Sequence, residues 1–196
     1  MEIVFATKNK GKLVEAKRIL SDFTIVGMEE LNIDIDVVED GETFEENALI
    51  KAREISKACG KVVMSDDSGI EIDFLDKKPG VHSARFLGHD TPYDIKNAKI
   101  LDMMKDVEKK DRTARYVAAI ALVFPEGREI VTTGYMEGRI GYEALGEGGF
   151  GYDPIFFVPE YNQTAAQMSA EFKNSISHRG KALRLMKEEM EKQLGV

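Results

Sequence analysis

The sequence has little cysteine and no long apolar run. Cys59 is the only cysteine among 196 residues, so no internal disulfide can form, and no Cys/His spacing typical of a structural zinc site occurs. No stretch approaches the roughly twenty apolar residues that a membrane-spanning helix needs. The N-terminal segment reaches charged residues after only a few apolar ones, unlike a signal peptide. We therefore expect a protein of the reducing cytoplasm that is neither exported nor inserted into a membrane.

Basic charge is also scarce. The chain has 27 Lys and Arg residues against 35 Asp and Glu residues, a net charge of −8. This balance argues against a protein that holds a nucleic acid polymer by neutralising its phosphates. Small anionic ligands stay compatible with the sequence, because a local group of cations can oppose the overall charge.

Internal repeats, low-complexity tracts and linkers are absent as well. Hydrophobic residues make up 43% and charged residues 32%, which excludes a disordered chain. This length is enough to bury a sizeable core. The sequence therefore predicts one globular domain, or one domain with two lobes.

Hydrophobic spacing predicts alternating strands and helices in the first third of the chain. Residues 3–6 form a short apolar run, and after a polar turn apolar residues recur at helical spacing over 13–20. Residues 23–38 alternate weakly and predict one or two more strands. A capping-box pattern at 43–46 begins the next helix, and Gly60 ends it.

A buried hairpin is predicted later in the chain. An apolar strand at 62–64 leads into an acidic segment, after which residues 70–74 alternate as on a half-buried strand. The longest apolar run, 116–124, is separated by a Pro-Glu-Gly turn from residues 129–135. These two segments predict an antiparallel hairpin at the centre of the sheet.

Two further helices are predicted, over residues 94–107 and from about Ser177 onward. Strands alternate with helices early in the chain, and the hairpin comes late. This order is typical of a mixed central β-sheet flanked by helices. The fold class predicted from the pattern alone is α/β.

A lysine-rich turn joins the first strand to the first helix. Free backbone N–H groups and the positive end of the helix dipole make such a junction an anion site, and lysines add charge to it. The turn lacks the first glycine and the Ser/Thr of a P-loop. A solvated, lysine-rich helix cap is an equally good interpretation. The residues concerned are Thr7, Lys8, Asn9, Lys10, Gly11 and Lys12.

Two acidic segments are candidate metal ligands. Glu39 and Asp40 precede a helix, and Asp66-Asp67-Ser68-Gly69 follows a buried strand. Carboxylates at the exit of an apolar strand are costly to bury alone, and Mg²⁺ is a partner that prefers oxygen ligands. A carboxylate there can also accept a proton from an attacking water. Helix caps and turn formers are the simpler interpretation of these acids.

Two more segments are candidate ligand contacts. The loop 148–154 combines glycines with Phe150, Tyr152 and Asp153, so a planar ring could stack there. A tight loop that leads into the strand 155–158 is nearly as good an interpretation. Near the start of the last helix lie three cations, Lys173, His178 and Arg179, where positive charge opposes the helix dipole and favours an anion or a hydrogen-bonding ligand.

Together these segments resemble the inosine/xanthosine triphosphate pyrophosphatase family. The motifs that carry the resemblance span nearly the whole chain in order, as FATKNKGKLVEA, TFEENALIKA, SDDSGIEIDFLDKKPGVHSARF, GFGYDPIFF and MSAEFKNSISHRGKAL. Five ordered motifs are far more specific than any one of them. The resemblance implies a single two-lobed domain over residues 1–196, with a nucleotide-binding cleft between its lobes.

The resemblance also implies the activity and the role of each site residue. A family member hydrolyses inosine, deoxyinosine or xanthosine triphosphate between the α and β phosphates with Mg²⁺, and is expected to be a homodimer. The triphosphate would contact Thr7–Lys12, above all Asn9 and Lys12, together with Lys51. Glu39 and Asp67 would hold Mg²⁺, and Asp67 would also be the proton acceptor. The other substrate contacts implied are Ser68, Phe150, Gly151, Tyr152, Asp153, Lys173, His178, Arg179 and, more weakly, Arg85.

Two other functions stay open at this point. A related septum-inhibitor-type pyrophosphatase would act on modified or pyrimidine nucleotides and would have a different base-reading loop from GFGYD. A nucleotide-binding module without turnover would release no pyrophosphate, although the presence of both Glu39 and Asp67 argues against it.

Overall fold

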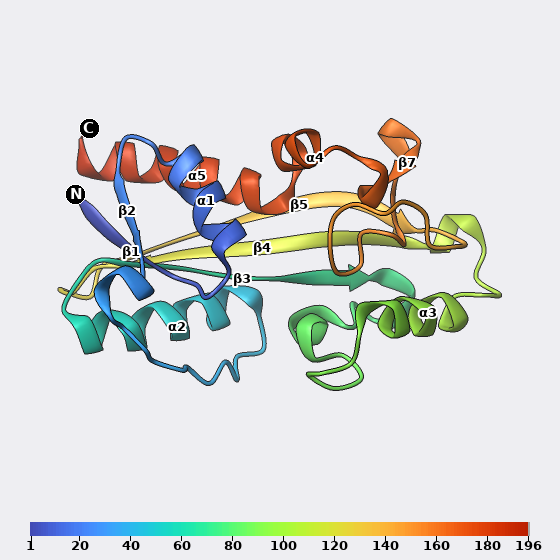
Figure 1. Cartoon of the computed structure of the whole chain (residues 1–196), viewed down its shortest axis with the longest axis horizontal. Helices are drawn as coiled ribbons and strands as arrows, with labels where there is room; N and C mark the ends of the chain where they lie inside the picture. The colour runs from blue at the N-terminus through green and yellow to red at the C-terminus, as the bar shows by residue number, and fades with distance from the viewer. Residues whose placement is uncertain (196) are drawn as a thin grey trace. The chain divides into compact units, whose positions relative to one another are not determined.

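The computed structural model describes residues 1–195, whose strands form a sheet flanked by helices (Figure 1). The strands are β1 Glu2–Ala6, β2 Thr24–Gly27, β3 Val63–Ile72, β4 Thr113–Val123, β5 Glu129–Ile140, β6 Phe156–Val158 and β7 Gln163–Thr164. The α-helices are α1 Lys10–Ile19, α2 Phe44–Cys59, α3 Tyr93–Met103, α4 Ala170–Ile176 and α5 His178–Leu194.

The sheet is mixed, as the sequence predicts. Its strand order is β2-β1-β3-β4-β5-β6-β7. β1 runs parallel to both β2 and β3, whereas β6 runs antiparallel to β5 and β7. β4 and β5 are neighbours joined by a tight turn in which the Phe124 N–H donates to the Arg128 carbonyl. The predicted central hairpin and the α/β class are therefore confirmed.

The chain divides into two compact units, which are described separately. Unit 1 comprises residues 1–67, 118–134 and 178–195, and unit 2 comprises residues 68–117 and 135–177. Three long strands, β3, β4 and β5, each contribute residues to both units. No helix within residues 1–195 is long and apolar enough to cross a membrane.

Unit 1 packs helices on both faces of its strands. α1 and α5 lie side by side on one face, and α2 lies on the other (Figure 1). Alternate residues of a strand point to opposite faces, so Ile3 and Phe5 of β1 enter the core beneath α1 and α5, while Val4 faces α2. This core also includes Met64 of β3, together with Ala16, Leu20, Ala182, Leu183, Met186 and Met190 from the helices.

Local signals in the sequence account for the bounds of α2. Thr43 accepts a hydrogen bond from the Glu46 N–H, and Glu46 accepts one from the Thr43 N–H, which completes the predicted capping box. Gly60 ends the helix with φ +66°, a left-handed conformation that favours glycine.

Unit 2 has a separate apolar core, with α3 on one face of its strands and α4 on the other (Figure 1). The buried residues come from both helical and strand segments and include Ile70, Ile72, Ile100, Met104, Tyr116, Met136, Ile140, Tyr152 and Phe156. The structure therefore holds two apolar cores, one in each unit.

Of the one or two strands predicted over residues 23–38, one forms, as β2, and residues 33–38 are not a strand. Four other predictions of secondary structure are wrong. The acidic segment after 62–64 is not a turn but part of the continuous strand β3, and Phe74 lies beyond it in a 3₁₀ turn. The third helix ends at Met103 rather than at residue 107.

The fourth of these errors concerns the C-terminal helix. Lys173 does not lie at the start of the last helix but on the separate helix α4, which Ser169 caps by accepting a hydrogen bond from the Phe172 N–H. Ser177 separates α4 from α5 with an extended backbone conformation. His178 and Arg179 begin α5, as predicted.

Candidate functional site

The lysine-rich turn lies where β1 ends and α1 begins, as predicted. Asn9 caps α1, because its side-chain oxygen accepts hydrogen bonds from the Gly11 N–H at 2.9 Å and the Lys12 N–H at 3.2 Å. The Thr7 hydroxyl accepts one from the Asn9 N–H at 3.1 Å. A phosphate that bound these two amides of α1 would therefore replace the Asn9 oxygen.

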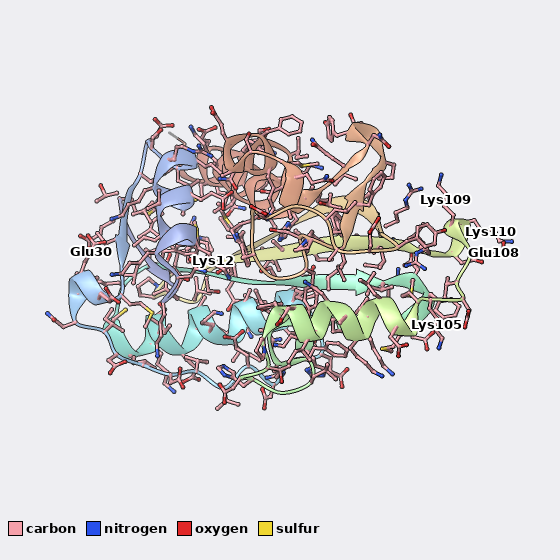
Figure 2. The ribbon with its side chains drawn as sticks, turned by 45° about the vertical axis from the view of Figure 1, so that its right-hand side comes forward. Lys12, Glu30, Lys105, Glu108, Lys109 and Lys110 are labelled. Atoms are coloured by element: carbon pink, nitrogen blue, oxygen red, sulfur yellow. The ribbon has the colours of Figure 1, made fainter. Side chains whose placement is uncertain are left out.

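Three lysines and three carboxylates surround a cavity of about 150 Å³ beside this turn. The lining includes Thr7, Lys8, Lys12, Asp36, Glu39, Lys51 and Asp66, all from unit 1. Each lysine is paired with one acid, as Lys8–Asp36 at 3.3 Å, Lys12–Asp66 at 2.7 Å and Lys51–Glu39 at 2.8 Å. The structure thus brings together four residues that the sequence assigned to phosphate and one assigned to metal. Lys12 lies on the first turn of α1 (Figure 2).

The two consecutive acids of β3 contact opposite sides of the strand. Ser65 and Asp67 face α2, where the Ser65 hydroxyl donates to the Ala48 carbonyl and Asn47 Nδ2 donates to Asp67 Oδ2 at 3.1 Å. Asp66 contacts residues of α1 and α5 instead. This alternation follows from the period of a β-strand. Asp67, the predicted proton acceptor, is half-buried and is not among the residues that line the cavity.

Asp66 is the acid most tightly enclosed by cations. Its side chain is 1% exposed, and Oδ2 lies 2.7 Å from Lys12 Nζ and 3.3 Å from Arg179 Nε. Burial alone raises the pKa of the Asp66 carboxyl, but the charges of Lys12, Arg179 and Lys51 outweigh burial and hold that pKa well below its usual range. Asp66 is therefore ionised at neutral pH.

Arg179 is buried and forms ion pairs with two acids. Its Nη1 lies 3.5 Å from Glu15 Oε2 on α1, in addition to its contact with Asp66. α5 can approach β5 closely at this point because Gly134 has no side chain, and a Cβ there would lie 2.2 Å from the His178 carbonyl oxygen. His178, the first residue of α5, is also buried. Close packing thus fixes both residues at the start of α5.

In unit 2, Asp153 holds the glycine-rich loop together. It is 1% exposed and accepts hydrogen bonds from the Tyr116 hydroxyl at 3.1 Å and the Phe150 N–H at 2.8 Å. Lys173 Nζ lies 2.5 Å from the same carboxylate. Gly149 and Gly151 have φ of +72° and +68°, as the turn around Asp153 requires. Asp153 and Lys173, both predicted as substrate contacts, are therefore directly paired.

The two aromatic residues of this loop differ in environment. Phe150 is 62% exposed, and its ring centre lies 4.9 Å from Lys173 Nζ. Tyr152 is buried in the core of unit 2, where its hydroxyl donates to the Ser83 carbonyl and its ring packs edge-on against Tyr93. Phe150 is thus the aromatic residue that a planar ligand can reach.

The remaining candidates occupy other positions. Ser68 is half-buried on β3 next to Asp67. Arg85 ends a 3₁₀ turn at Gly80–Arg85 and donates from Nε to His82 Nδ1 at 3.1 Å. Lys10 is exposed on the first turn of α1. Lys10 does not line the cavity of unit 1, and Ser68 and Arg85 belong to unit 2.

Sequence reasoning missed three residues of these clusters, namely Glu15 on Arg179, Asn47 on Asp67 and Tyr116 on Asp153. It named Asp66 only within an acidic segment of candidate metal ligands, and not as the partner of Lys12 and Arg179. A signal for Asp66 existed, because two consecutive acids on an extended strand must point to opposite faces. Turn formers were the simpler interpretation of this segment, and that interpretation concealed the signal. No comparable signal marks Glu15, since a glutamate on an amphipathic helix is normally exposed.

Known proteins match almost the full length of the chain. The Ham1 family matches residues 3–189. A dITP/XTP pyrophosphatase of Desulforamulus reducens is 46% identical over 186 residues, which cover 94% of this chain and 92% of that protein. A dITP/XTP pyrophosphatase of Clostridium perfringens is 44% identical over 197 residues, covering 96% of this chain and 97% of the other.

Solved structures match as well. The structure of the Ham1 protein of Staphylococcus aureus superposes with a TM-score of 0.91 at 40% identity, and the match covers 98% of this chain and all of that chain. The mixed sheet and its flanking helices are therefore the arrangement found in that protein.

Proposed function

Because the chain belongs to the Ham1 family, we propose that it hydrolyses the non-standard purine nucleoside triphosphates dITP, ITP and XTP to a monophosphate and pyrophosphate. The names of the relatives support the substrate class. The observation that carries the proposal is the cavity of unit 1, where three lysines and three carboxylates face the same space. Cations of this kind bind phosphates, and carboxylates bind the divalent cation that accompanies them.

In this proposal, the lysines of the cavity bind the triphosphate. Lys12 and Lys51 are each paired with an acid, at 2.7 Å and 2.8 Å, so their ammonium groups are already held at the cavity. Lys8 lies at the exposed rim, with its side chain 65% exposed. Positive charge fixed in this way stabilises the negative charge that develops on the leaving pyrophosphate.

We infer that Glu39 and Asp67 are the two carboxylates that would hold a magnesium ion. Within residues 1–195 no three His, Cys, Asp or Glu side chains group closely enough to form a metal cage. Mg²⁺ is normally bound by only one or two carboxylates, with waters and substrate phosphates as the other ligands. Glu39 lines the cavity, whereas Asp67 does not line it and would supply a second carboxylate from the neighbouring position on β3. When bound there, magnesium would neutralise charge on the phosphate oxygens.

Asp67 is the proposed proton acceptor for the attacking water. Asn47 Nδ2 donates to Asp67 Oδ2 at 3.1 Å, which fixes the carboxylate in orientation. A carboxylate oriented in this way can take a proton from water while that water attacks the α-phosphorus in line with the leaving group.

In this proposal, selectivity among purines comes from hydrogen-bond donors of the protein that contact the six-position of the ring. A keto oxygen accepts a hydrogen bond where adenine has an amino group, so a site that donates to O6 leaves a buried donor unpaired when ATP binds. Arg179 is engaged by Asp66 and Glu15, which favours His178 or backbone N–H groups as the donors. Phe150 offers an exposed ring for stacking, with Lys173 beside it.

Product analysis tests the proposed function. We expect dITP, ITP and XTP to give monophosphate and pyrophosphate with magnesium, little product without it, and little from ATP, GTP or dTTP under any condition. Chromatography of the nucleotides with a pyrophosphate assay measures this. Release of orthophosphate and a diphosphate would contradict the proposed cleavage position. Turnover of dTTP above that of dITP would favour the septum-inhibitor type of pyrophosphatase, and binding of dITP without any product would favour a non-catalytic module.

Replacing Phe150 with alanine is expected to raise the KM for dITP. Stacking of a base on an aromatic ring contributes about 1–3 kcal/mol, so KM should rise by about 5-fold to 150-fold. The melting temperature should stay near the wild-type value, because the ring is 62% exposed. Phe74→Ala is the matched control, since Phe74 is another exposed aromatic residue of unit 2, at 53%. An equal rise of KM in both variants would remove Phe150 from base recognition.

We also propose that the protein acts as a homodimer in the cytoplasm. The single cysteine, Cys59, is compatible with a reducing compartment, and the family resemblance supports the dimer. Sedimentation equilibrium of the purified protein measures the oligomeric state, and a monomer at all concentrations would contradict the dimer.

A further inference from the structure

Asp66 contacts Lys12, which the proposed function assigns to the triphosphate, and Arg179, a buried cation at the start of α5. Its Oδ2 accepts from Lys12 Nζ at 2.7 Å and from Arg179 Nε at 3.3 Å. It also lines the cavity of about 150 Å³ in unit 1, together with Lys12 and Lys51. Asp66 is therefore placed to set both the position and the effective charge of these groups.

The second carboxylate oxygen of Asp66, Oδ1, is bonded differently from the oxygens of an ordinary structural carboxylate. Within the described residues 1–195, Oδ1 is buried and has no hydrogen-bond partner. Buried carboxylates normally have both oxygens hydrogen-bonded, because an unsatisfied buried acceptor costs free energy. A structural role alone would be served as well by a carboxylate with complete hydrogen bonding. The incomplete bonding therefore points to a role at the cavity that Asp66 lines.

The two cations differ in how far a ligand can reach them. The Lys12 side chain is 21% exposed and lines the cavity, so an anion can approach its ammonium group. The Arg179 side chain is 9% exposed and is also held by Glu15, so it stays in place whatever the cavity contains. An anion in the cavity would therefore compete with Asp66 for Lys12 but not for Arg179.

We propose that Asp66 is a positioning residue that fixes Lys12 and Arg179 and competes with bound anions for Lys12, so that it promotes release of the pyrophosphate product. This inference rests on the proposed function, because it concerns the same cavity. A fixed negative charge beside the phosphate-binding cation weakens retention of every polyphosphate. It also keeps the Lys12 ammonium in one position between turnovers.

Asp66→Asn tests the proposal, because the amide keeps the shape of the side chain and removes its charge. We expect pyrophosphate, titrated alone by isothermal calorimetry, to bind about tenfold more tightly than to the wild type. We expect kcat for dITP to fall by about tenfold, because Lys12 is less well positioned and the product leaves more slowly. If Asp66 had a purely structural role, its replacement by asparagine would weaken pyrophosphate binding instead. An unchanged or reduced pyrophosphate affinity, or an unchanged kcat, would overturn the proposal.

A second variant keeps the proposal testable if Asp66→Asn does not fold. Asp66→Glu keeps the charge but moves it by one methylene, so we expect pyrophosphate affinity within about twofold of wild type and kcat reduced by about tenfold. Wild-type kcat in this variant would overturn the positioning role. Asp22→Asn is the control, because Asp22 pairs with Lys187 in unit 1 with a side chain that is 63% exposed. It should change neither quantity.

The two measurements separate failure of this inference from failure of the proposed function. If the wild type releases no pyrophosphate from dITP, the proposed function fails, and calorimetry with pyrophosphate alone still decides whether Asp66 limits anion retention. If the wild type hydrolyses dITP and Asp66→Asn binds pyrophosphate no more tightly, only the assignment of Asp66 fails.

Discussion

Asp67→Asn is expected to lower kcat for dITP by about 10²-fold to 10⁴-fold, the range for loss of a general base. The asparagine amide cannot accept a proton from water, and it is a poorer magnesium ligand than a carboxylate. Its carbonyl oxygen can still accept the hydrogen bond that Asn47 Nδ2 donates to Asp67 at 3.1 Å. The melting temperature should therefore stay close to that of the wild type while turnover is lost.

Initial rates at saturating dITP and magnesium measure this effect. Asp34→Asn is the matched control, because Asp34 is an exposed acid of unit 1 that belongs to neither acidic segment of the candidate site. It should keep the wild-type kcat. A near-normal kcat for Asp67→Asn would remove Asp67 from its catalytic role and leave Asp66, the neighbouring acid, to be tested in its place.

Arg179→Ala is expected to destabilise the fold by about 3–5 kcal/mol, the usual loss when one partner of a buried ion pair is removed. Asp66 and Glu15 would remain buried with less cationic charge beside them. Urea unfolding near pH 7 measures the free energy of unfolding. Arg18→Ala, an exposed arginine of α1, is the control and should change stability by less than about 0.5 kcal/mol. An equal loss in both variants would show that the buried pairs of Arg179 contribute nothing specific.

The loss of stability in Arg179→Ala should depend on pH. In the folded protein the pKa of Asp66 lies below its usual range, so ionised Asp66 contributes stability above its unfolded pKa of about 3.9. That contribution is lost as the pH falls below this value toward the lower folded pKa. Without Arg179, Asp66 takes up a proton more readily in acid, which relieves the uncompensated charge. The difference from the wild type should therefore be largest near pH 7 and smaller near pH 4.

Arg179→Ala should also disturb the start of α5. A change in the preference for ITP over ATP in that variant would combine altered base recognition with a disturbed helix start at α5. His178 lies next to Arg179 at the same helix start, so its position would change as well.

Much of the fold was predictable because its signals are local. The Thr43–Glu46 capping box and the terminal Gly60 define α2 through residues that lie within a few positions of one another. The central hairpin is marked by two apolar runs around a turn. In contrast, the sequence left open whether residues 23–38 hold one strand or two, and only β2 forms. A strand also needs a neighbouring strand with free backbone N–H and C=O groups, and a single sequence does not reveal that partner.

The sequence predicted which residues belong to the candidate site better than it predicted which of them contact one another. The motifs named Lys12, Glu39 and Lys51, and the structure places all three at one cavity. The pairing of Asp66 with Lys12 and Arg179 joins residues of three elements far apart in the sequence. Such pairs depend on tertiary packing, for which helical and strand periods carry no signal. The roles of Asp67, His178 and the base-reading loop stay predictions.

The alternating directions of Asp66 and Asp67 on β3 constrain how this segment can change in evolution. A single residue gained or lost between Val63 and Asp66 would rotate the strand by one step and exchange the two carboxylates between the faces of the sheet. After a deletion, Asp67 would take the place of Asp66 and point at Lys12. After an insertion, Asp66 would take the place of Asp67 and point at Asn47, and in both cases the other acid would lose its present partner. Substitutions in this strand can therefore accumulate one at a time, whereas a change in its length would require both helices to acquire new partners together.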